Sequence, residues 1–142
     1  LVAITPAAGY VGGLSSIIFG LVAGVGCYFL IGLKNKLGYD DSLDVVGVHG
    51  GGGVLGGLLL GLFADNSAVN SEPGGFQDGV FFGGGELFID QLVAMGSVIA
   101  FSFIVTFGIA KVLDATIGLR VSEEDEEAGL DQSQHAETAY NL

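Results

Sequence analysis

Residues 44–63 read Asp-Val-Val-Gly-Val-His-Gly-Gly-Gly-Gly-Val-Leu-Gly-Gly-Leu-Leu-Leu-Gly-Leu-Phe, and after the first residue only His49 carries a polar side chain. A run of roughly 20 apolar residues is long enough to cross a bilayer as an α-helix. An ionisable ring at membrane depth is costly unless it faces protein or a water-filled path, so such residues usually mark a functional route. The run therefore predicts a membrane helix whose imidazole belongs to a conduction or relay path.

The composition of the whole chain favours the same class of protein. Half of the 142 residues are hydrophobic, 14% are charged, and the mean hydropathy is +0.65, which is unusual for a soluble domain. The 26 glycines fit helices that pack closely in lipid. The net charge is −12 with only four Lys and Arg, so we expect no nucleic-acid partner, because phosphate binding needs a basic surface.

The apolar pattern predicts an all-α, polytopic membrane helix bundle over residues 1–120, followed by an acidic tail at 121–142. The first segment is too short to cross a bilayer, so we expect it to be the end of a truncated helix. The predicted elements of the bundle are this truncated helix at 1–11, helices at about 13–33, 45–64 and 87–117, and an irregular, Gly- and Ser-rich loop at 65–86.

The few basic residues predict the orientation of these helices. With three crossings, all four fall on one side of the membrane, and the 65–86 loop has none. The positive-inside rule assigns the basic side to the cytoplasm. We therefore expect a multi-pass protein of the cell membrane with an external 65–86 loop and a cytoplasmic C-terminus.

The surroundings of His49 can be inferred from helical spacing. Residues three, four and seven positions away share its face, which gives Val45, Val46, Gly52, Gly53 and Gly56. The three glycines either leave space beside the imidazole or serve ordinary helix packing, and the sequence favours neither. Asp44 stands where an N-cap residue is expected.

Imidazole can donate through one nitrogen and accept through the other, with an ordinary pKa near 6.5. His49 could thus exchange a proton with a small polar solute; the plainer alternative is a ring satisfied by one interhelical hydrogen bond. No second His or Cys stands at ligand spacing in the membrane part, so no metal or cofactor is expected, and a haem-binding subunit would need another histidine. We find no nucleophile with an adjacent base and no phosphate-binding loop, so we do not expect an enzyme.

Several motifs occur in order along the chain: Ile-Thr-Pro-Ala-Ala-Gly-Tyr at 4–10, Asp-Asp-Ser-Leu-Asp-Val-Val-Gly-Val-His-Gly at 40–50, Asp-Ala-Thr-Ile-Gly-Leu-Arg-Val at 114–121, Gly-Leu-Asp at 129–131 and His-Ala-Glu-Thr-Ala-Tyr at 135–140. Together they resemble the ammonium transporter (Amt/MEP/Rh) family. The resemblance runs from end to end, and the tail places the chain nearer the Amt branch than the Rh branch.

The resemblance implies an eleven-helix inverted-repeat fold, assembled as a homotrimer, of which this chain would be the last four helices. It also implies conduction of ammonium or ammonia through a narrow hydrophobic pore. His49 stands at the position of the second of two paired pore histidines, and its partner would lie on a helix outside this sequence. Thr5 matches a pore-side threonine, and Asp44 matches an acid at the start of the histidine helix.

The tail can be interpreted in two ways. Its composition alone predicts a solvated, mobile terminus. The resemblance instead implies a segment that folds over the cytoplasmic face, contacts a neighbouring subunit and lies near a docking surface for PII signalling proteins. The candidate residues for this regulatory role are Gly129, Leu130, Asp131, Ser133, His135 and Tyr140. A membrane ammonium sensor that signals through the tail is the alternative to a transporter.

Overall fold

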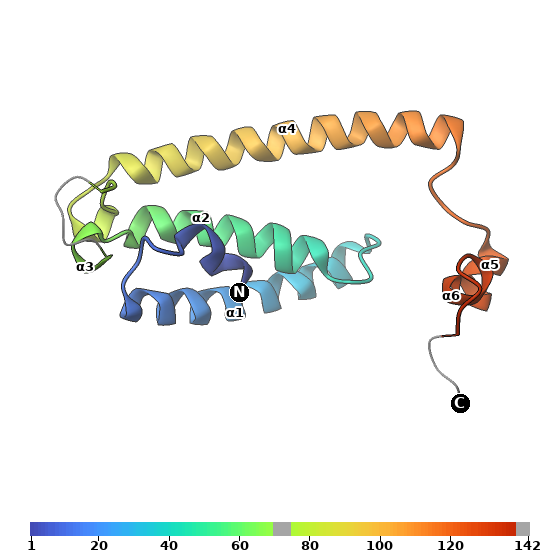
Figure 1. Ribbon diagram of the computed structural model, residues 1–142, viewed down its shortest axis with the longest axis horizontal. Coiled ribbons are helices and arrows are strands. Elements are labelled where there is room, and N and C mark those ends of the chain that lie inside the picture. The colour runs from blue at the N-terminus through green and yellow to red at the C-terminus, as the bar shows by residue number, and fades with distance from the viewer. Residues whose placement is uncertain (70–74, 139–142) are drawn as a thin grey trace. The chain divides into compact units, whose positions relative to one another are not determined.

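The computed structural model describes residues 1–69 and 75–138 and divides into two compact units, Leu1–Ile99 and Ala100–Leu142. Every regular element of the described residues is helical, which confirms the predicted all-α class (Figure 1). The elements are η1 (Val2–Ala7), α1 (Gly13–Leu37), η2 (Val46–Gly51), α2 (Gly52–Phe63), α3 (Asn66–Val69), η3 (Val80–Phe82), α4 (Glu86–Thr116), α5 (Glu123–Ala128) and α6 (Leu130–Ser133).

Three helical segments of the described chain are long and apolar enough to cross a membrane. They are α1, the continuous helix formed by η2 and α2, and α4. The 31 residues of α4 correspond to roughly 46 Å at 1.5 Å per residue. That length exceeds a hydrocarbon core of about 30 Å, so a membrane-spanning α4 must tilt or extend beyond the lipid.

Glycines end two of the three long helices. Gly38 follows α1 with a φ of 70°, and its N–H donates to the carbonyl of Lys34. Gly118 follows α4 with a φ of 80°, and its N–H donates to the carbonyl of Leu113 over 3.1 Å. A left-handed residue just past the last turn is the usual way to satisfy the final carbonyls of a helix, and glycine adopts it without steric cost.

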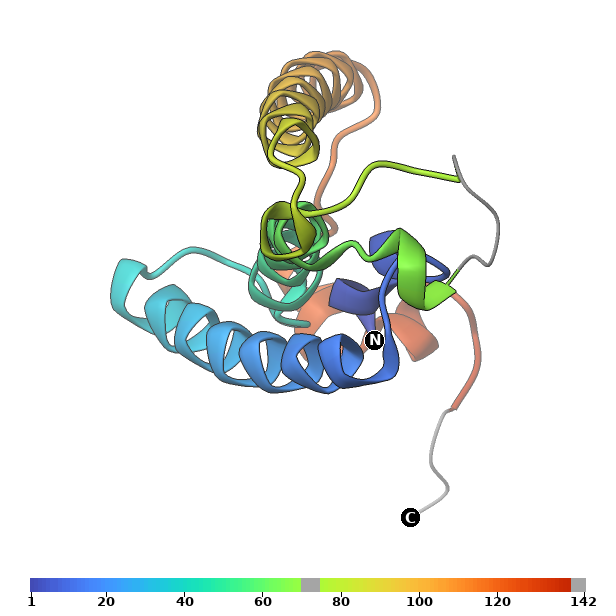
Figure 2. The same ribbon diagram turned by 90° about the vertical axis from the view of Figure 1, so that its left-hand side faces the viewer.

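Within the first unit, α2 packs against α1 and lies beside the first half of α4 (Figures 1 and 2). A Cβ at Gly57 would lie 2.5 Å from the sulfur of Met95, and one at Gly61 would lie 2.8 Å from the Cα of Phe88. These two glycines belong to the four-residue spacing that favours close helix packing in membranes. The sequence of α2 therefore sets how near α4 can approach.

The N-terminal segment forms a short 3-10 helix within residues 1–11, where the sequence predicts the end of a truncated helix. It ends at Ala7. Pro6 has no N–H to donate, and Gly9 has a φ of 84°, so the chain turns here before α1. The 3-10 helix lies against α2 at Gly56, where a Cβ would lie 2.8 Å from the Cα of Ala3.

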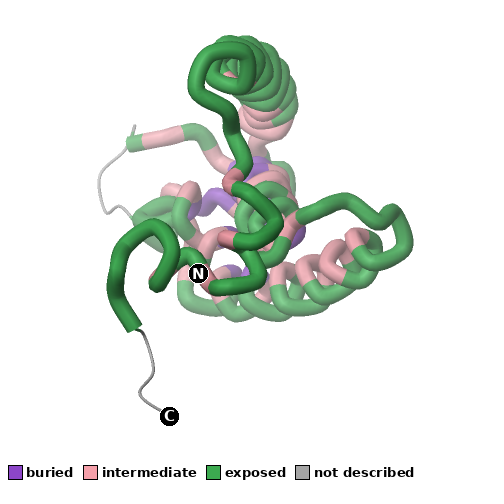
Figure 3. The backbone as a smooth tube through the Cα atoms, turned by 90° about the vertical axis from the view of Figure 1, so that its right-hand side faces the viewer, coloured by how far each residue is buried: buried purple, intermediate pink, exposed green. Residues whose placement is uncertain are grey.

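The hydrophobic core of the first unit lies where η1, α1 and the C-terminal end of α2 meet. Its buried residues are Ala7, Phe19, Leu59, Leu60 and Ala64. Figure 3 shows buried positions concentrated in this region, whereas α4 has no buried residue and exposes its apolar side chains. Large exposed apolar surfaces mark contact with lipid or with other protein segments.

The connection between α2 and α4 is more regular than the expected loop at 65–86, because it contains α3 and η3. The carboxylate of Asp65, which is 8% exposed, accepts hydrogen bonds from the Ser67 hydroxyl at 2.7 Å and the Ala68 N–H at 3.0 Å. The Phe81 ring packs edge-on against Phe63 with centroids 4.8 Å apart. Side-chain caps and aromatic contacts thus fasten the described part of this connection to the end of α2.

We predict that Gly56→Ala destabilises the protein. The added methyl group would meet the backbone of η1, which cannot rotate aside as a side chain can, and overpacking of this kind typically costs about 1–3 kcal/mol. Thermal unfolding of the full-length protein in detergent, followed by circular dichroism, measures the effect.

The matched control is Gly53→Ala, one turn earlier on the same helix, where nothing described lies within 4 Å of the new Cβ. We expect it to be neutral or stabilising, because alanine favours helices over glycine by about 1 kcal/mol. Equal melting temperatures for the two variants would contradict the close contact at Gly56.

Candidate functional site

His49 lies in η2, a π-helical segment that leads directly into α2. π-helical turns are rare, less favourable than α-helical ones, and often found at functional sites. The imidazole is exposed, and no hydrogen bond or ion pair joins it to another described residue. The ring is therefore available to a solute or to a segment beyond these 142 residues.

The π-helix changes the neighbours expected for His49 from a 3.6-residue period. Gly52 and Gly56 both face η1: a Cβ at Gly52 would lie 3.6 Å from Val2, and one at Gly56 would meet Ala3. A Cβ at Gly53 would meet nothing described within 4 Å. No residue pattern indicates the π-helix directly, although the four glycines at 50–53 weaken the preference for a regular α-helix.

Asp41, and not Asp44, caps the histidine helix. The two carboxylate oxygens of Asp41 accept hydrogen bonds from the N–H groups of Val45 and Val46, each at 2.8 Å. Asp44 does stand at the start of the helix, where its carbonyl accepts the N–H of Val48 over 2.8 Å, but the expected side-chain cap is not made, because its carboxylate pairs with Lys34. The sequence analysis assigned no role to Asp41 or Lys34. For Asp41 the available signal was its position, an acid four residues before Val45 and therefore near the helix start.

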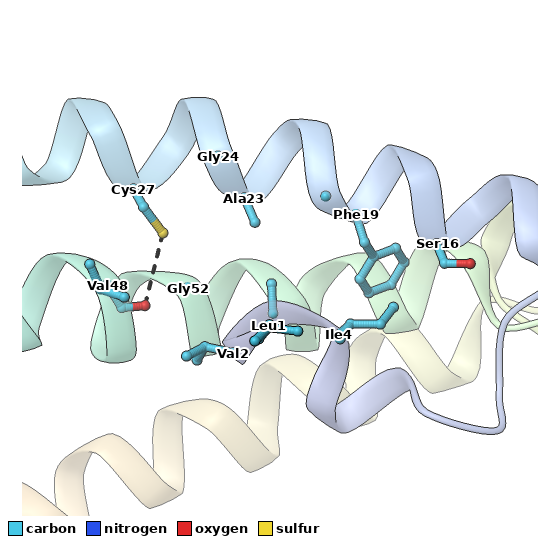
Figure 4. Close-up of a pocket in the computed structure, with 12 residues that line it drawn as sticks. Leu1, Val2, Ile4, Ser16, Phe19, Ala23, Gly24, Cys27, Val48 and Gly52 are labelled. Atoms are coloured by element: carbon cyan, nitrogen blue, oxygen red, sulfur yellow. Dashed lines mark hydrogen bonds between the residues drawn. The ribbon is translucent and has the colours of Figure 1, made fainter.

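A groove of about 520 Å³ runs between η1, α1 and the start of α2 (Figure 4). Its lining residues are Leu1, Val2, Ala3, Ile4, Ser16, Phe19, Gly20, Ala23, Gly24, Cys27, Val48 and Gly52. Most of these are apolar or lack a side chain. At one end the Cys27 thiol donates weakly to the carbonyl of Val48, with sulfur and oxygen 3.9 Å apart.

Neither of the two predicted pore residues lines this groove. His49 directly follows Val48 on η2 but points elsewhere, since it is exposed and absent from the lining. Thr5 lies on η1 and is also exposed; its hydroxyl donates to the carbonyl of Leu1 over 3.1 Å. The structure thus places Thr5 and His49 on two contacting segments, η1 and the η2–α2 helix, without joining their side chains by a hydrogen bond.

In the second unit the acidic tail contains two short helices, α5 and α6, which the composition of the tail does not predict. Ser122 caps α5 by accepting the N–H of Asp125 over 3.2 Å. Arg120 holds the carboxylate of Glu126 with two hydrogen bonds of 2.6 and 2.8 Å. This fork-like pairing connects the segment after α4 to α5.

Five of the six candidate regulatory residues lie at or just after α6. Gly129 begins the turn into α6 with a φ of 94°, and the Ser133 hydroxyl donates to its carbonyl over 3.1 Å. The N–H of His135 donates to the carbonyl of Leu130 over 3.3 Å, and Asp131 lies within the helix. Tyr140 lies outside the described residues.

Comparison with known proteins identifies the family. The sequence model of the Ammonium Transporter Family matches residues 1–140. The chain is 48% identical over 141 residues to the ammonium transporter of Bacillus subtilis, covering 99% of this chain and 34% of that protein. It is 45% identical over 140 residues to ammonium transporter Amt1 of Archaeoglobus fulgidus, again covering 99% and 34%.

Solved structures agree. The crystal structure of Candida albicans Mep2 is similar with a TM-score of 0.78 and 34% identity, over 94% of this chain and 30% of that one. Saccharomyces cerevisiae Mep2 gives a TM-score of 0.77 and 31% identity, over 86% and 28%. The chain belongs to the ammonium transporter family, and it spans about a third of the length of the relatives it matches.

We predict that Arg120 sets the pKa of Glu126. Its hydrogen bonds to the carboxylate hold the pKa of Glu126 below the usual value, against a smaller opposing effect of burial. A lowered pKa means that the pair supports the folded tail above the ordinary glutamate pKa of about 4.3, and that this support is lost as the pH falls through the lowered value. Carboxyl ¹³C NMR of labelled glutamate, titrated from neutral to acidic pH, measures it.

Arg120→Gln is the matched variant, since it keeps a hydrogen-bonding side chain and removes the charge. The midpoint of Glu126 should rise toward the ordinary value, and Glu126→Gln identifies which resonance belongs to this residue. An unchanged midpoint in Arg120→Gln would show that the pair does not exist in solution.

Proposed function

We propose that this chain is part of an ammonium transporter or channel that conducts ammonia, with or without its proton, through a hydrophobic pore lined by a histidine pair. His49 is one member of the pair, and the other would come from outside these 142 residues. The observation that carries the proposal is the family match over residues 1–140. It is supported by the exposed imidazole, which no described residue hydrogen-bonds, on a segment apolar enough to cross a membrane.

The chemistry of the solute suits such a ring. Ammonium pays a large desolvation cost in an apolar lumen, whereas neutral ammonia pays much less. An imidazole can accept a hydrogen bond or proton from the solute through one nitrogen while donating through the other. In this proposal Thr5 offers a hydroxyl on the pore side, and Gly53, where a Cβ would meet nothing described within 4 Å, leaves room for the solute beside the helix, whereas Gly52 and Gly56 are packed on η1.

The remaining parts of the proposal concern assembly and location. The transporter is a homotrimer in the cell membrane, with a cytoplasmic C-terminus that contacts a neighbouring subunit and a PII-type signalling protein. The two ordered tail helices support an interaction role for residues 122–138. They also support the second candidate, a membrane ammonium sensor that signals through the tail and would bind ammonium without sustained uptake.

We predict that His49→Ala in the full-length protein abolishes or deregulates transport. Loss of a group that lowers the barrier by about 1.4 kcal/mol changes a rate about tenfold, so we expect at least this change. Ammonium-driven current in proteoliposomes and uptake of labelled methylammonium provide the measurement. Leu43→Ala, at a residue that is 82% exposed and precedes η2, is the control. Unchanged current and uptake in His49→Ala would remove His49 from the mechanism.

We predict that removing residues 122–142 separates regulation from conduction. The truncated transporter should lose capture by a PII protein or show altered cooperativity between subunits, because α5 and α6 are removed. It should still prefer the same solute, since no predicted pore residue is deleted. Pull-down with purified PII protein and competition between ammonium and methylammonium test the two parts, and a changed preference would place the tail in the conduction path.

A further inference from the structure

We propose that Lys34 is a positioning residue for the imidazole of His49. It acts by anchoring Asp41 and Asp44, which together hold the first, π-helical turn of the histidine helix. The proposal rests on the proposed function for what the ring does, but the orientation of the ring is measurable without transport.

The contacts form one connected cluster at the end of α1. The ammonium group of Lys34 donates to the backbone carbonyl of Asp41 over 2.8 Å and pairs with the carboxylate of Asp44. The side chain of Lys34 is only 18% exposed. Because the Asp41 carboxylate in turn accepts the first two N–H groups of the helix, a single side chain of α1 contacts two acids of the connecting turn, Asp41 and Asp44.

The backbone of Asp44 shows why an anchor is needed. Its φ of 55° is a left-handed conformation that L-residues other than Asn and Asp rarely adopt. In this conformation the carboxylate reaches Lys34, and the carbonyl accepts the N–H of Val48 over 2.8 Å. The ion pair therefore holds the residue whose carbonyl begins the hydrogen-bond ladder leading to His49.

A π-helical turn is closed by i→i+5 hydrogen bonds and is rare compared with an α-helical turn, so we expect the segment to revert to an α-helix when its surroundings no longer hold it. Reversion would turn His49 relative to α2 by about one residue, roughly 100° around the helix axis. The middle of α2 cannot follow, because Gly56 and Gly57 are packed on η1 and α4. Loss of the anchor at the N-terminal end should thus reorient the imidazole while α2 stays in place.

Lys36 provides a matched control. It carries the same charge two residues later, is exposed, and contacts neither acid among the described residues. Any effect of lost charge near this helix end should appear equally in Lys34→Met and Lys36→Met. Only Lys34→Met should move His49.

The experiment uses the full-length transporter with ¹⁵N-labelled histidine, and His49→Gln identifies the ring resonances. Lys34→Met should shift the ¹⁵N signals and tautomer ratio of His49 and lower the ammonium-driven current about tenfold, a barrier change of about 1.4 kcal/mol. Lys36→Met should leave the ring signals and the current as in the wild type. Lys34→Arg, which keeps the positive charge, should do the same. Wild-type ring signals in an assembled Lys34→Met trimer would overturn the proposal.

Asp44→Asn tests the anchor from the other side and remains informative if Lys34→Met does not fold. Asparagine tolerates the left-handed conformation but lacks the charge, so the ring signals should shift as in Lys34→Met, and the double variant should add nothing further. Fully additive shifts would overturn the proposal. If the wild type carries no ammonium current, the proposed function fails, while the ring signals still decide the positioning role.

Discussion

Close backbone contact at the glycines of α2 is the constraint on which the first unit depends. Helices in lipid gain no hydrophobic energy from meeting each other, so they associate where small residues permit extensive van der Waals contact. One face of α2 receives η1 at Gly56 and another receives α4 at Gly57 and Gly61. A helix with bulky side chains at these positions could not be approached from both directions, and the segments around it would separate.

The thickness of a bilayer explains which parts of the fold could be predicted. The three long helices follow from apolar runs of the length that a bilayer requires, so their existence was readable from the sequence, and the family resemblance was confirmed. The 3-10 helix at the N-terminus was not readable as such, because its conformation depends on contact with α2 and not on local preference. The tail helices were underestimated since a six-residue helix depends on its cap and on the Arg120–Glu126 pair, not on periodicity.

The candidate site shows where sequence reasoning stops. His49 stood out because an ionisable ring is conspicuous in an apolar run. The neighbours of His49 could not be predicted in the same way, because a π-helix breaks the 3.6-residue spacing from which neighbours are inferred. The exchange of roles between Asp41 and Asp44 has a similar cause: two acids three residues apart can both reach a helix start, and only the backbone conformation decides which one caps it. The role of His49 stays a prediction.

Cys27 gives the groove a practical use. It is the only cysteine in the 142 residues, and its thiol lies at the groove wall within 3.9 Å of the Val48 carbonyl, one residue before His49. A nitroxide or fluorophore attached there would sit beside the π-helical turn while leaving the imidazole unmodified. The chain thus carries a built-in reporter position, from which water access and local motion near the histidine could be followed by spectroscopy in a bilayer.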